Sequence, residues 1–291
     1  MRRRLVIFDS TLREGAQLPE SLLLIEERVA IAAMLERLNV DVIEAGFAGA
    51  SREGFLSVQA VSRVVKKAVV CSLCRPLKDD VDTAVEALSQ ARRGRIHIFL
   101  AAADPVLRNR PNMSRSQVLQ QAVVAVEYAR SKCADIQITI KDAGQTEQGF
   151  LIKLLSAVIQ AGASTVILSD PSGHCLPEEM GALVRDVRER VRELDRVVLG
   201  VHVRDDLGLA LASTIAAIDA GVQQVECTIN GVGDGFGICA LEGLVNALKV
   251  RQDYFAFVRT DINEEFFLEA NRLVARALGT RVPRLYAAAV R

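Results

Sequence analysis

The sequence lacks an excess of charge of either sign. Its 291 residues include 36 Lys and Arg against 36 Asp and Glu, so the formal net charge at pH 7 is zero. Proteins that bind nucleic acids or anionic membrane surfaces rely on clustered positive charge. The composition therefore gives no support to a nucleic-acid partner or to membrane-surface binding.

Long hydrophobic runs are also lacking. No apolar stretch approaches the roughly 20 residues that a membrane-spanning helix needs. The N-terminal MRRR is followed by only four apolar residues, so it does not resemble a signal peptide. Half of the residues are hydrophobic and 25% are charged, without low-complexity segments. We therefore predict a globular protein with a large core, no membrane span and no signal peptide.

Cysteines are few and scattered. Cys71 and Cys74 have the spacing of a redox motif, but they lie in the strand-like run AVVCSLCR. Residues three apart on a strand point to opposite faces, which is poor geometry for a dithiol site. Buried, reduced thiols are expected instead, and they favour a cytoplasmic protein.

Apolar, β-branched runs alternate with longer helical stretches along the whole chain. Strands are predicted at 5–8, 41–47, 67–73, 95–101, 135–140, 164–170, 197–203 and 223–229, and helices near 21–38, 53–65, 79–91, 114–132, 147–161, 178–193, 207–219, 240–250 and 263–278. Near-continuous apolar strands indicate a parallel sheet covered by helices. Eight such units in roughly 250 residues predict an α/β fold, a (β/α)8 TIM barrel, over a doubly wound sheet, which usually has fewer strands. We expect one domain over 1–291, with an additional C-terminal helix.

Catalytic residues of such barrels lie where strands end. The polar residues at these positions are Arg13, Glu14, Glu44, Arg75, Asp104, Lys141, Asp142, Asp170, His202, Arg204 and the segment 230–237. Together they predict a charged site at one end of the barrel. Arginine–carboxylate pairs that only stabilise the barrel rim are the alternative.

The stretch FDSTLREGAQ at 8–17 resembles the opening motif of the homocitrate synthase and 2-isopropylmalate synthase family, which reads close to FDSTLREGEQ or FDTTLRDGEQ. Further similar segments follow in the family's order. They are IEAGF at 43–47, SLCR at 72–75, DAGQT at 142–146, GASTVILSDPSG at 162–173, VHVRDDLGLALA at 201–212 and VECTINGVGDGFG at 225–237. The resemblance covers the barrel almost end to end. The chain ends where longer relatives continue, so no C-terminal regulatory domain is expected.

The resemblance implies an enzyme that joins the acetyl group of acetyl-CoA to the ketone of a 2-oxo acid. In the family a divalent metal ion chelates the 2-oxo acid, held by the acid of R-[DE]-G and both histidines of H-x-H. On that basis Glu14 and His202 would bind the metal, and Arg13 would bind and polarise the ketone oxygen. The relatives also dimerise through the C-terminal helix, which implies a homodimer. Packing of that helix on its own barrel would give the same apolar pattern.

Several residues depart from the family pattern. Arg204 stands in place of the second histidine, Lys141 in place of a glutamate, Gln145 in place of an arginine, Pro171 in place of a threonine and Ile238 in place of an asparagine. A guanidinium has no lone pair for a metal. Two remaining ligands fall below the three that catalytic zinc usually has. We therefore expect binding of Zn, Mn or Mg to be weakened or lost, with Arg204 and Lys141 supplying positive charge in its place.

Three functions are open at this point. The first is a divergent enzyme that makes or breaks a carbon–carbon bond of a 2-oxo acid or thioester, by aldol or Claisen chemistry. Arg13 would hold the substrate oxygen, Glu44 would orient it and His202 would bind metal or move protons. The side chains of Arg75, Gln145, Asp170 and Arg204 would select the substrate.

The second function is a metal-free aldolase or lyase that forms a Schiff base through Lys141, although Lys141 paired with Glu44 or Asp170 is the simpler interpretation. The third is a non-catalytic protein that binds a metabolite. Gly231 and Gly233, in the loop after the last strand, are candidates for binding phosphate or CoA, and an ordinary turn explains them equally well.

Two further histidines bear on the site. His97, in the middle of a strand, is interpreted as a hydrogen-bonded core residue. His174 lies in a loop on the predicted active rim and is a possible replacement acid or base.

Overall fold

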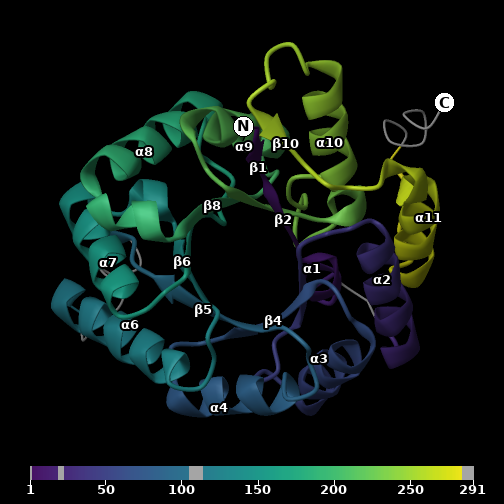
Figure 1. The fold of residues 1–291 in the computed structure, drawn as a ribbon, viewed down its shortest axis with the longest axis horizontal. Coiled ribbons are helices and arrows are strands. Elements are labelled where there is room, and N and C mark those ends of the chain that lie inside the picture. Colours follow the sequence, from purple (N-terminus) through teal and green to yellow (C-terminus); the bar gives the residue numbers. More distant parts are fainter. Residues whose placement is uncertain (1, 19–22, 105–113, 284–291) are drawn as a thin grey trace.

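The computed structural model describes residues 2–18, 23–104 and 114–283. Eight parallel strands close a barrel in chain order, and helices surround it (Figure 1). The strands are β2 (Val6–Asp9), β3 (Val42–Gly46), β4 (Val69–Cys74), β5 (Gly94–Ala101), β6 (Ile136–Lys141), β7 (Thr165–Asp170), β8 (Val198–Val203) and β9 (Gln224–Cys227). The predicted (β/α)8 barrel is confirmed, with every strand within a few residues of its predicted position.

The helices also follow the predicted order. They are α2 (Ile25–Arg37), α3 (Arg52–Val64), α4 (Lys78–Ala87), α6 (Arg115–Arg130), α7 (Gln148–Gln160), α8 (Pro177–Arg190), α9 (Ala210–Ala220), α10 (Leu241–Val250) and the additional C-terminal helix α11 (Phe267–Ala277). Residues 21 and 22 of the first predicted helix lie outside the described residues. The apolar face of α11 packs on α2 of its own barrel, so the predicted homodimer stays a prediction. Across the described parts of the chain, no helix is both long and apolar enough to cross a membrane.

Three short elements had no signal in the sequence. The strands β1 (Arg3–Arg4) and β10 (Val258–Arg259) pair with each other outside the barrel, and the helical turn α1 (Thr11–Gly15) follows β2 directly. Elements of two to five residues are too short for a period to show. The turn begins where the buried Asp9 carboxylate accepts hydrogen bonds from the backbone N–H of Thr11 at 2.9 Å and from its hydroxyl at 3.0 Å.

The barrel has two separate apolar regions. The large core lies between strands and helices, while a small cluster of Phe8, Val42, Val69 and Cys71 fills part of the barrel interior. Cys71 belongs to the small apolar cluster and Cys74 to the large core. The two thiols therefore face opposite sides of β4, as predicted. All of the cysteines are free.

The rest of the barrel interior near the amino-terminal ends of the strands is polar. The buried Arg95 donates to the side-chain oxygens of Gln137 at 3.1 Å and of Gln224 at 3.0 Å, and the Gln224 amide donates to Gln137 at 2.9 Å. Arg95 also pairs with Asp135 at 3.0 Å. These residues lie at the starts of their strands, so the network closes the amino-terminal end of the barrel. The cavity described below lies at the opposite end.

The loop after β9 is anchored from outside by the last two helices. Asn230 has a positive φ of 61°, its backbone N–H donates to the Glu242 carboxylate on α10 at 3.0 Å, and its side chain donates to the Asn271 carbonyl on α11 at 3.0 Å. Burial raises the pKa of Glu242 to about 7. The C-terminal helices thereby fix a loop that, as shown below, borders the candidate site.

We expect Phe8→Ala to lower the free energy of unfolding by about 3–5 kcal/mol, because Phe8 is fully buried and its removal leaves a cavity inside the barrel. Phe236→Ala is the matched control, since that ring is 76% exposed and its loss should change stability by less than about 0.5 kcal/mol. Urea unfolding followed by circular dichroism measures both. Equal effects would contradict this assignment of the barrel interior.

Glu242→Gln tests the buried acid. A carboxyl group with a raised pKa favours the folded state below its unfolded pKa near 4.5, and this contribution is lost as the pH rises toward about 7. We expect the variant to be more stable than the wild type by about 1–3 kcal/mol at pH 8, with the difference vanishing at pH 4. Urea unfolding at both pH values measures it. A variant that is less stable at pH 8 would contradict the raised pKa.

Candidate active site

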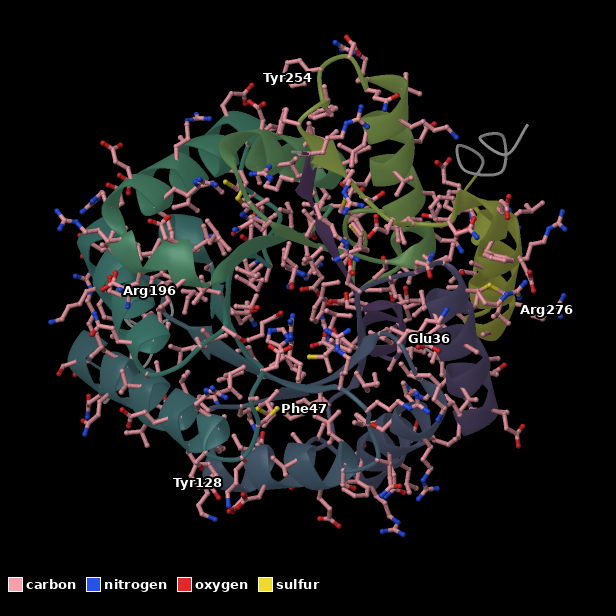
Figure 2. All side chains as sticks on the ribbon, in the orientation of Figure 1. Glu36, Phe47, Tyr128, Arg196, Tyr254 and Arg276 are labelled. Carbon is pink, nitrogen blue, oxygen red and sulfur yellow. The ribbon has the colours of Figure 1, made fainter. Side chains whose placement is uncertain are left out.

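Side chains converge in the middle of the barrel (Figure 2), where a cavity of about 310 Å³ opens at the carboxyl-terminal ends of the strands. Five of the residues predicted from the sequence line it: Arg13, Glu14, Lys141, His202 and Arg204. They come from β6, β8, the loop after β8 and the turn after β2. The structure thus brings these five residues together at one cavity, and their functional roles stay predictions.

Arg13 is held by three carboxylates. Its Nη1 lies 2.6 Å from Glu14, its Nη2 lies 2.7 Å from Glu226, and its Nε donates to Glu44. Burial lowers the pKa of Arg13, but the three carboxylates outweigh it and raise that pKa well above its ordinary value. Three of the five guanidinium N–H groups are used in this way, which leaves one on each Nη for a ligand in the cavity.

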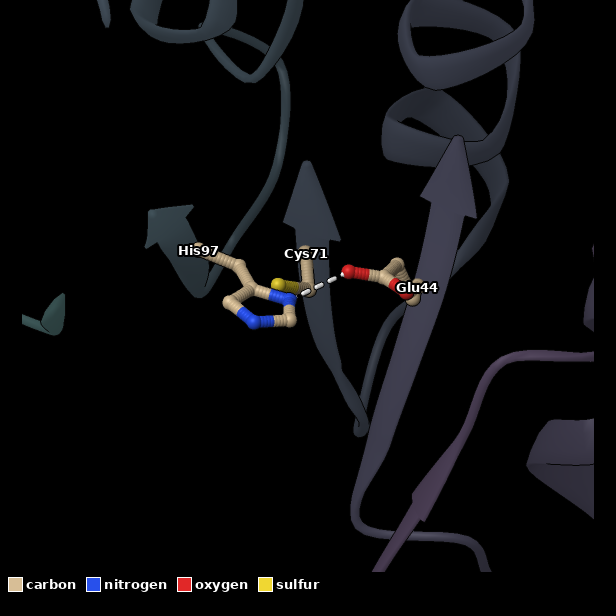
Figure 3. A group of neighbouring side chains, drawn as sticks. All are labelled: Glu44, Cys71 and His97. Carbon is tan, nitrogen blue, oxygen red and sulfur yellow. Dashed lines mark hydrogen bonds and ion pairs between the residues drawn. The ribbon is translucent and has the colours of Figure 1, made fainter. Parts of the chain in front are cut away.

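Glu44 lies beneath Arg13 rather than in the cavity wall. It is fully buried, and its second oxygen is 2.6 Å from Nδ1 of His97 (Figure 3). The other ring nitrogen of His97 is 2.6 Å from the Thr139 hydroxyl. The interpretation of His97 as a hydrogen-bonded core residue is confirmed, although its ring also borders the cavity. Glu44 therefore positions Arg13 and His97 at once.

Within the described parts of the chain, Glu44, His97 and Cys71 form one of two side-chain groups compact enough to hold a metal ion. Burial and the nearby Glu44 raise the pKa of the Cys71 thiol well above its ordinary value, and both ring nitrogens of His97 already have partners. A metal would need the thiolate form of this cysteine. Glu44 and His97 are thus a hydrogen-bonded pair of the core, and Cys71 is a buried thiol beside them.

The second group is better suited to a metal. Glu14, His202 and Glu226 are all buried, and one donor atom from each lies within 4.8 Å of the others. Nδ1 of His202 is 3.1 Å from Glu226, yet it lacks hydrogen-bond geometry there and has no hydrogen-bond partner among the described residues. Two carboxylates and an imidazole nitrogen match the ligand types and the count of a catalytic zinc or manganese site.

This finding corrects the expectation of a two-ligand site. Sequence reasoning missed Glu226, although it lies in the segment VECTINGVGDGFG that carries the resemblance. The available signal was alternation along β9, since Gln224 and Glu226 are two apart and both point into the barrel. The donor set is therefore complete in number despite Arg204.

The charged residues Arg13, Glu14, Glu44 and Glu226, called the inner cluster below, carry uncompensated negative charge. Three carboxylates surround one guanidinium, which leaves a formal charge of −2 before any histidine is protonated. Burial disfavours the charged form of His202, but Glu226 outweighs this effect and raises the pKa of His202. Burial likewise opposes ionisation of Glu226, yet the charges of His202 and Arg13 hold the pKa of Glu226 far below its ordinary range. The cluster therefore attracts cations.

Arg204 and Lys141, the two cations that depart from the family pattern, have different environments. Arg204 pairs with Asp206 at 2.9 Å and with Asp234 at 3.5 Å, so its charge is largely neutralised. Contrary to the expectation from the sequence, it does not supply free positive charge. Lys141 lies with its ammonium 5.7 Å from the centre of the Phe99 ring. No carboxylate of the described residues lies within ion-pair distance of it. The pairing with Glu44 or Asp170 considered above is absent.

The other predicted substrate-binding residues lie outside this cavity. Arg75 is half exposed and pairs with Asp80 through two nitrogens, at 2.7 and 2.8 Å. Gln145 and Asp170 border a separate hollow of about 550 Å³ beside His174. Asp170 accepts from the Ser172 hydroxyl at 2.9 Å and from the Cys175 backbone at 2.8 Å. Their roles in substrate binding, and that of His174, stay predictions.

The glycine loop contacts the metal-donor group. A side chain at Gly233 would lie 3.3 Å from the Glu14 carboxylate, and the backbone N–H of Asp234 donates to that carboxylate at 3.4 Å. Gly231 has a positive φ of 66°, and a side chain at Gly237 would clash with the Gly231 carbonyl at 1.9 Å. Glycine is thus needed for the loop to fold over Glu14. Phosphate binding by Gly231 and Gly233 stays a prediction.

Comparison with known proteins agrees with this geometry. The 2-isopropylmalate synthases of Nitrosomonas europaea and Methylococcus capsulatus are 43% and 45% identical to this chain over 279 residues, which is 96% of the chain and 54% of either protein. The chain thus spans about half the length of the curated relatives it matches. The HMG-CoA lyase of Bacillus subtilis has the same fold, with a TM-score of 0.81 and 18% identity over 99% of both chains. A family model described as HMGL-like matches residues 4–274, and the chain belongs to that family.

Proposed function

We propose that this protein makes or breaks a carbon–carbon bond of a 2-oxo acid or acyl-CoA substrate by aldol or Claisen chemistry. The observation that carries the proposal is the Arg13 guanidinium, fixed by three carboxylates at the wall of the cavity with two N–H groups to spare. The relatives at 43–45% identity are 2-isopropylmalate synthases, so acetyl-CoA and a 2-oxo acid are the first substrates to consider.

Arg13 is suited to an oxygen that gains negative charge. In an aldol or Claisen addition, a carbanion equivalent attacks the ketone carbon and the ketone oxygen becomes an alkoxide. In the reverse direction the alkoxide collapses to the ketone. A guanidinium held rigidly in a buried site stabilises that charge without having to reorganise. Glu14, Glu44 and Glu226 provide the rigidity.

His202 is the side chain best placed to hold a proton beside Arg13. Its imidazole borders the cavity, and the Glu226 carboxylate, 3.1 Å from its Nδ1, raises its pKa against the effect of burial. Glu226 therefore supports two groups, the arginine and the histidine. Glu44 has the same double role one layer deeper, for Arg13 and His97.

A divalent ion held by Glu14, His202 and Glu226 would supply Lewis-acid polarisation of the substrate oxygens. Each carboxylate has lone pairs beyond those that Arg13 uses, so the guanidinium and an ion can share them. The −2 formal charge of the cluster equals what such an ion would neutralise.

The proposal is tested by incubating the protein with acetyl-CoA and a panel of 2-oxo acids, with and without Mn²⁺, Zn²⁺ or Mg²⁺. Release of the CoA thiol and the mass of the acid product are measured. We expect Arg13→Lys to lower kcat by about 100-fold, because lysine keeps the charge but loses the fork that the three carboxylates hold. Arg251→Lys, at an exposed surface pair with Asp253, should leave kcat unchanged.

Absence of CoA release with every acid, or an Arg13→Lys variant with full activity, would refute the proposal. Circular dichroism of each variant establishes that it is folded.

Metal binding should strengthen with pH. Because the pKa of His202 is raised, its imidazole is protonated in mildly acidic solution, and an ion must displace that proton to bind. We expect the Kd for Mn²⁺ to fall by up to about tenfold per pH unit below the pKa of His202, measured by calorimetry between pH 5.5 and pH 8.

His202→Asn and Glu226→Gln should each weaken Mn²⁺ binding by at least about tenfold, whereas His174→Asn, in the separate hollow, is the matched control. Binding that is independent of pH, or equal in His202→Asn and the wild type, would exclude this donor set.

A further inference from the structure

The cavity wall contains two cations that the proposed chemistry does not use, Lys141 and Arg204, and of these only Arg204 has a carboxylate partner among the described residues. Lys141 ends β6, which lies across the barrel from β2 and the Arg13 turn (Figure 1). In the closed barrel of eight strands, β6 is the fourth strand after β2 in either direction, so the two strands lie opposite each other. Arg13 and Lys141 therefore face the cavity from opposite sides.

The charges that border the cavity are unevenly distributed. Arg13 and Arg204 both have carboxylate partners, whereas Lys141 has none within ion-pair distance among the described residues. Excess negative charge thus surrounds Arg13 and His202. Lys141 acts on one nearby carboxyl, that of Asp142, whose pKa burial raises and the lysine charge lowers, but the two side chains form no ion pair. An ammonium beside an aromatic ring has lost part of its hydration and gains from an anionic partner.

The strand register places Lys141 in one row with two other cavity residues. Lys141 is aligned with Ser169 on β7, and Ser169 is aligned with His202 on β8. Neighbouring strands lie about 4.8 Å apart, so the backbones of Lys141 and His202 are separated by roughly 10 Å. That span fits a small acid with one end at His202 and the other at Lys141.

Among the described residues that line the cavity next to Lys141, the polar ones are the uncharged Thr139 and Ser169. Phe99 lies under the ammonium and packs edge-on against Phe47 at 6.2 Å between ring centres, and Leu73 completes this apolar surface. A substrate with an uncharged end there would leave the lysine unpaired in a mostly apolar corner. An anionic end would neutralise it.

We propose, on the basis of the proposed function, that Lys141 is a specificity-determining residue that binds a second anionic group of the substrate. The substrate class is then a 2-oxo acid with an additional carboxylate or phosphonate at its far end. The 2-oxo acid end lies at Arg13 and His202, and the far anion forms an ion pair with the Lys141 ammonium.

The test is a pair of acids that differ only at that end. 2-Oxoglutarate and 2-oxovalerate have the same five-carbon chain and end in a carboxylate and a methyl group, respectively. Calorimetry in the presence of Mn²⁺, without acetyl-CoA, measures the affinity of the intact protein for each. We expect the wild type to bind the dianion at least tenfold more tightly.

Lys141→Met should abolish this preference while changing the affinity for 2-oxovalerate by less than twofold. Lys141→Arg should retain most of the preference, and Lys141→Glu, which restores the residue type of the family pattern, should reverse it. Lys153→Met, an exposed lysine on α7, is the matched control and should behave as the wild type. The phosphonate analogue of 2-oxoglutarate and the four- and six-carbon dianions, each with its monoanionic partner, define the group and the chain length.

Equal affinity for dianions and their partners, a preference that survives in Lys141→Met, or no binding of any dianion would overturn the assignment. So would an adduct of a 2-oxo acid on Lys141 after borohydride reduction, because it would show a Schiff base instead of an ion pair. Binding as expected without CoA release would refute the proposed reaction and leave the role of Lys141 standing, so the two failures are distinguishable.

Discussion

The arrangement of the site depends on one buried guanidinium. Arg13 forms ion pairs with Glu14 on its own turn, with Glu44 on β3 and with Glu226 on β9. It therefore joins elements on both sides of the point where the barrel closes. Each of these carboxylates would be costly to bury alone, and removing one partner of a buried ion pair typically costs about 3–5 kcal/mol. The site therefore exists only as a set, which explains why positions far apart in the sequence act together.

The sequence was sufficient for the fold because its signals are local and repeated. Eight β-branched runs separated by helical stretches fix a parallel barrel, and the barrel fixes where strand ends meet. The positions of Arg13, Glu14 and His202 at one site therefore follow from the sequence alone. Glu226 was harder to recognise, because alternation along β9 places Gln224 and Glu226 on one face without showing whether that face is the barrel interior or the helix side.

Ion pairing was the part of the site that the sequence could not predict. Arg204 and Lys141 look alike as cations that replace family residues, but part of each environment comes from residues distant in the sequence. Asp206 in the same loop and Asp234 in the loop after β9 neutralise Arg204, while the Phe99 ring on β5 lies next to Lys141. Arg75, whose role in substrate binding stays a prediction, is paired with Asp80, five residues further along the chain.

These environments bear on whether fixed cations replaced a metal. A replacement would have to lie among the carboxylates that an ion would neutralise. Arg204 points its charge at two other acids, and Lys141 lies across the cavity from Arg13. Neither reduces the −2 charge of the inner cluster, so the demand for a cation there persists. The change at position 141 thus lies on the opposite wall of the cavity, where we propose that it selects the substrate rather than activating the oxo group.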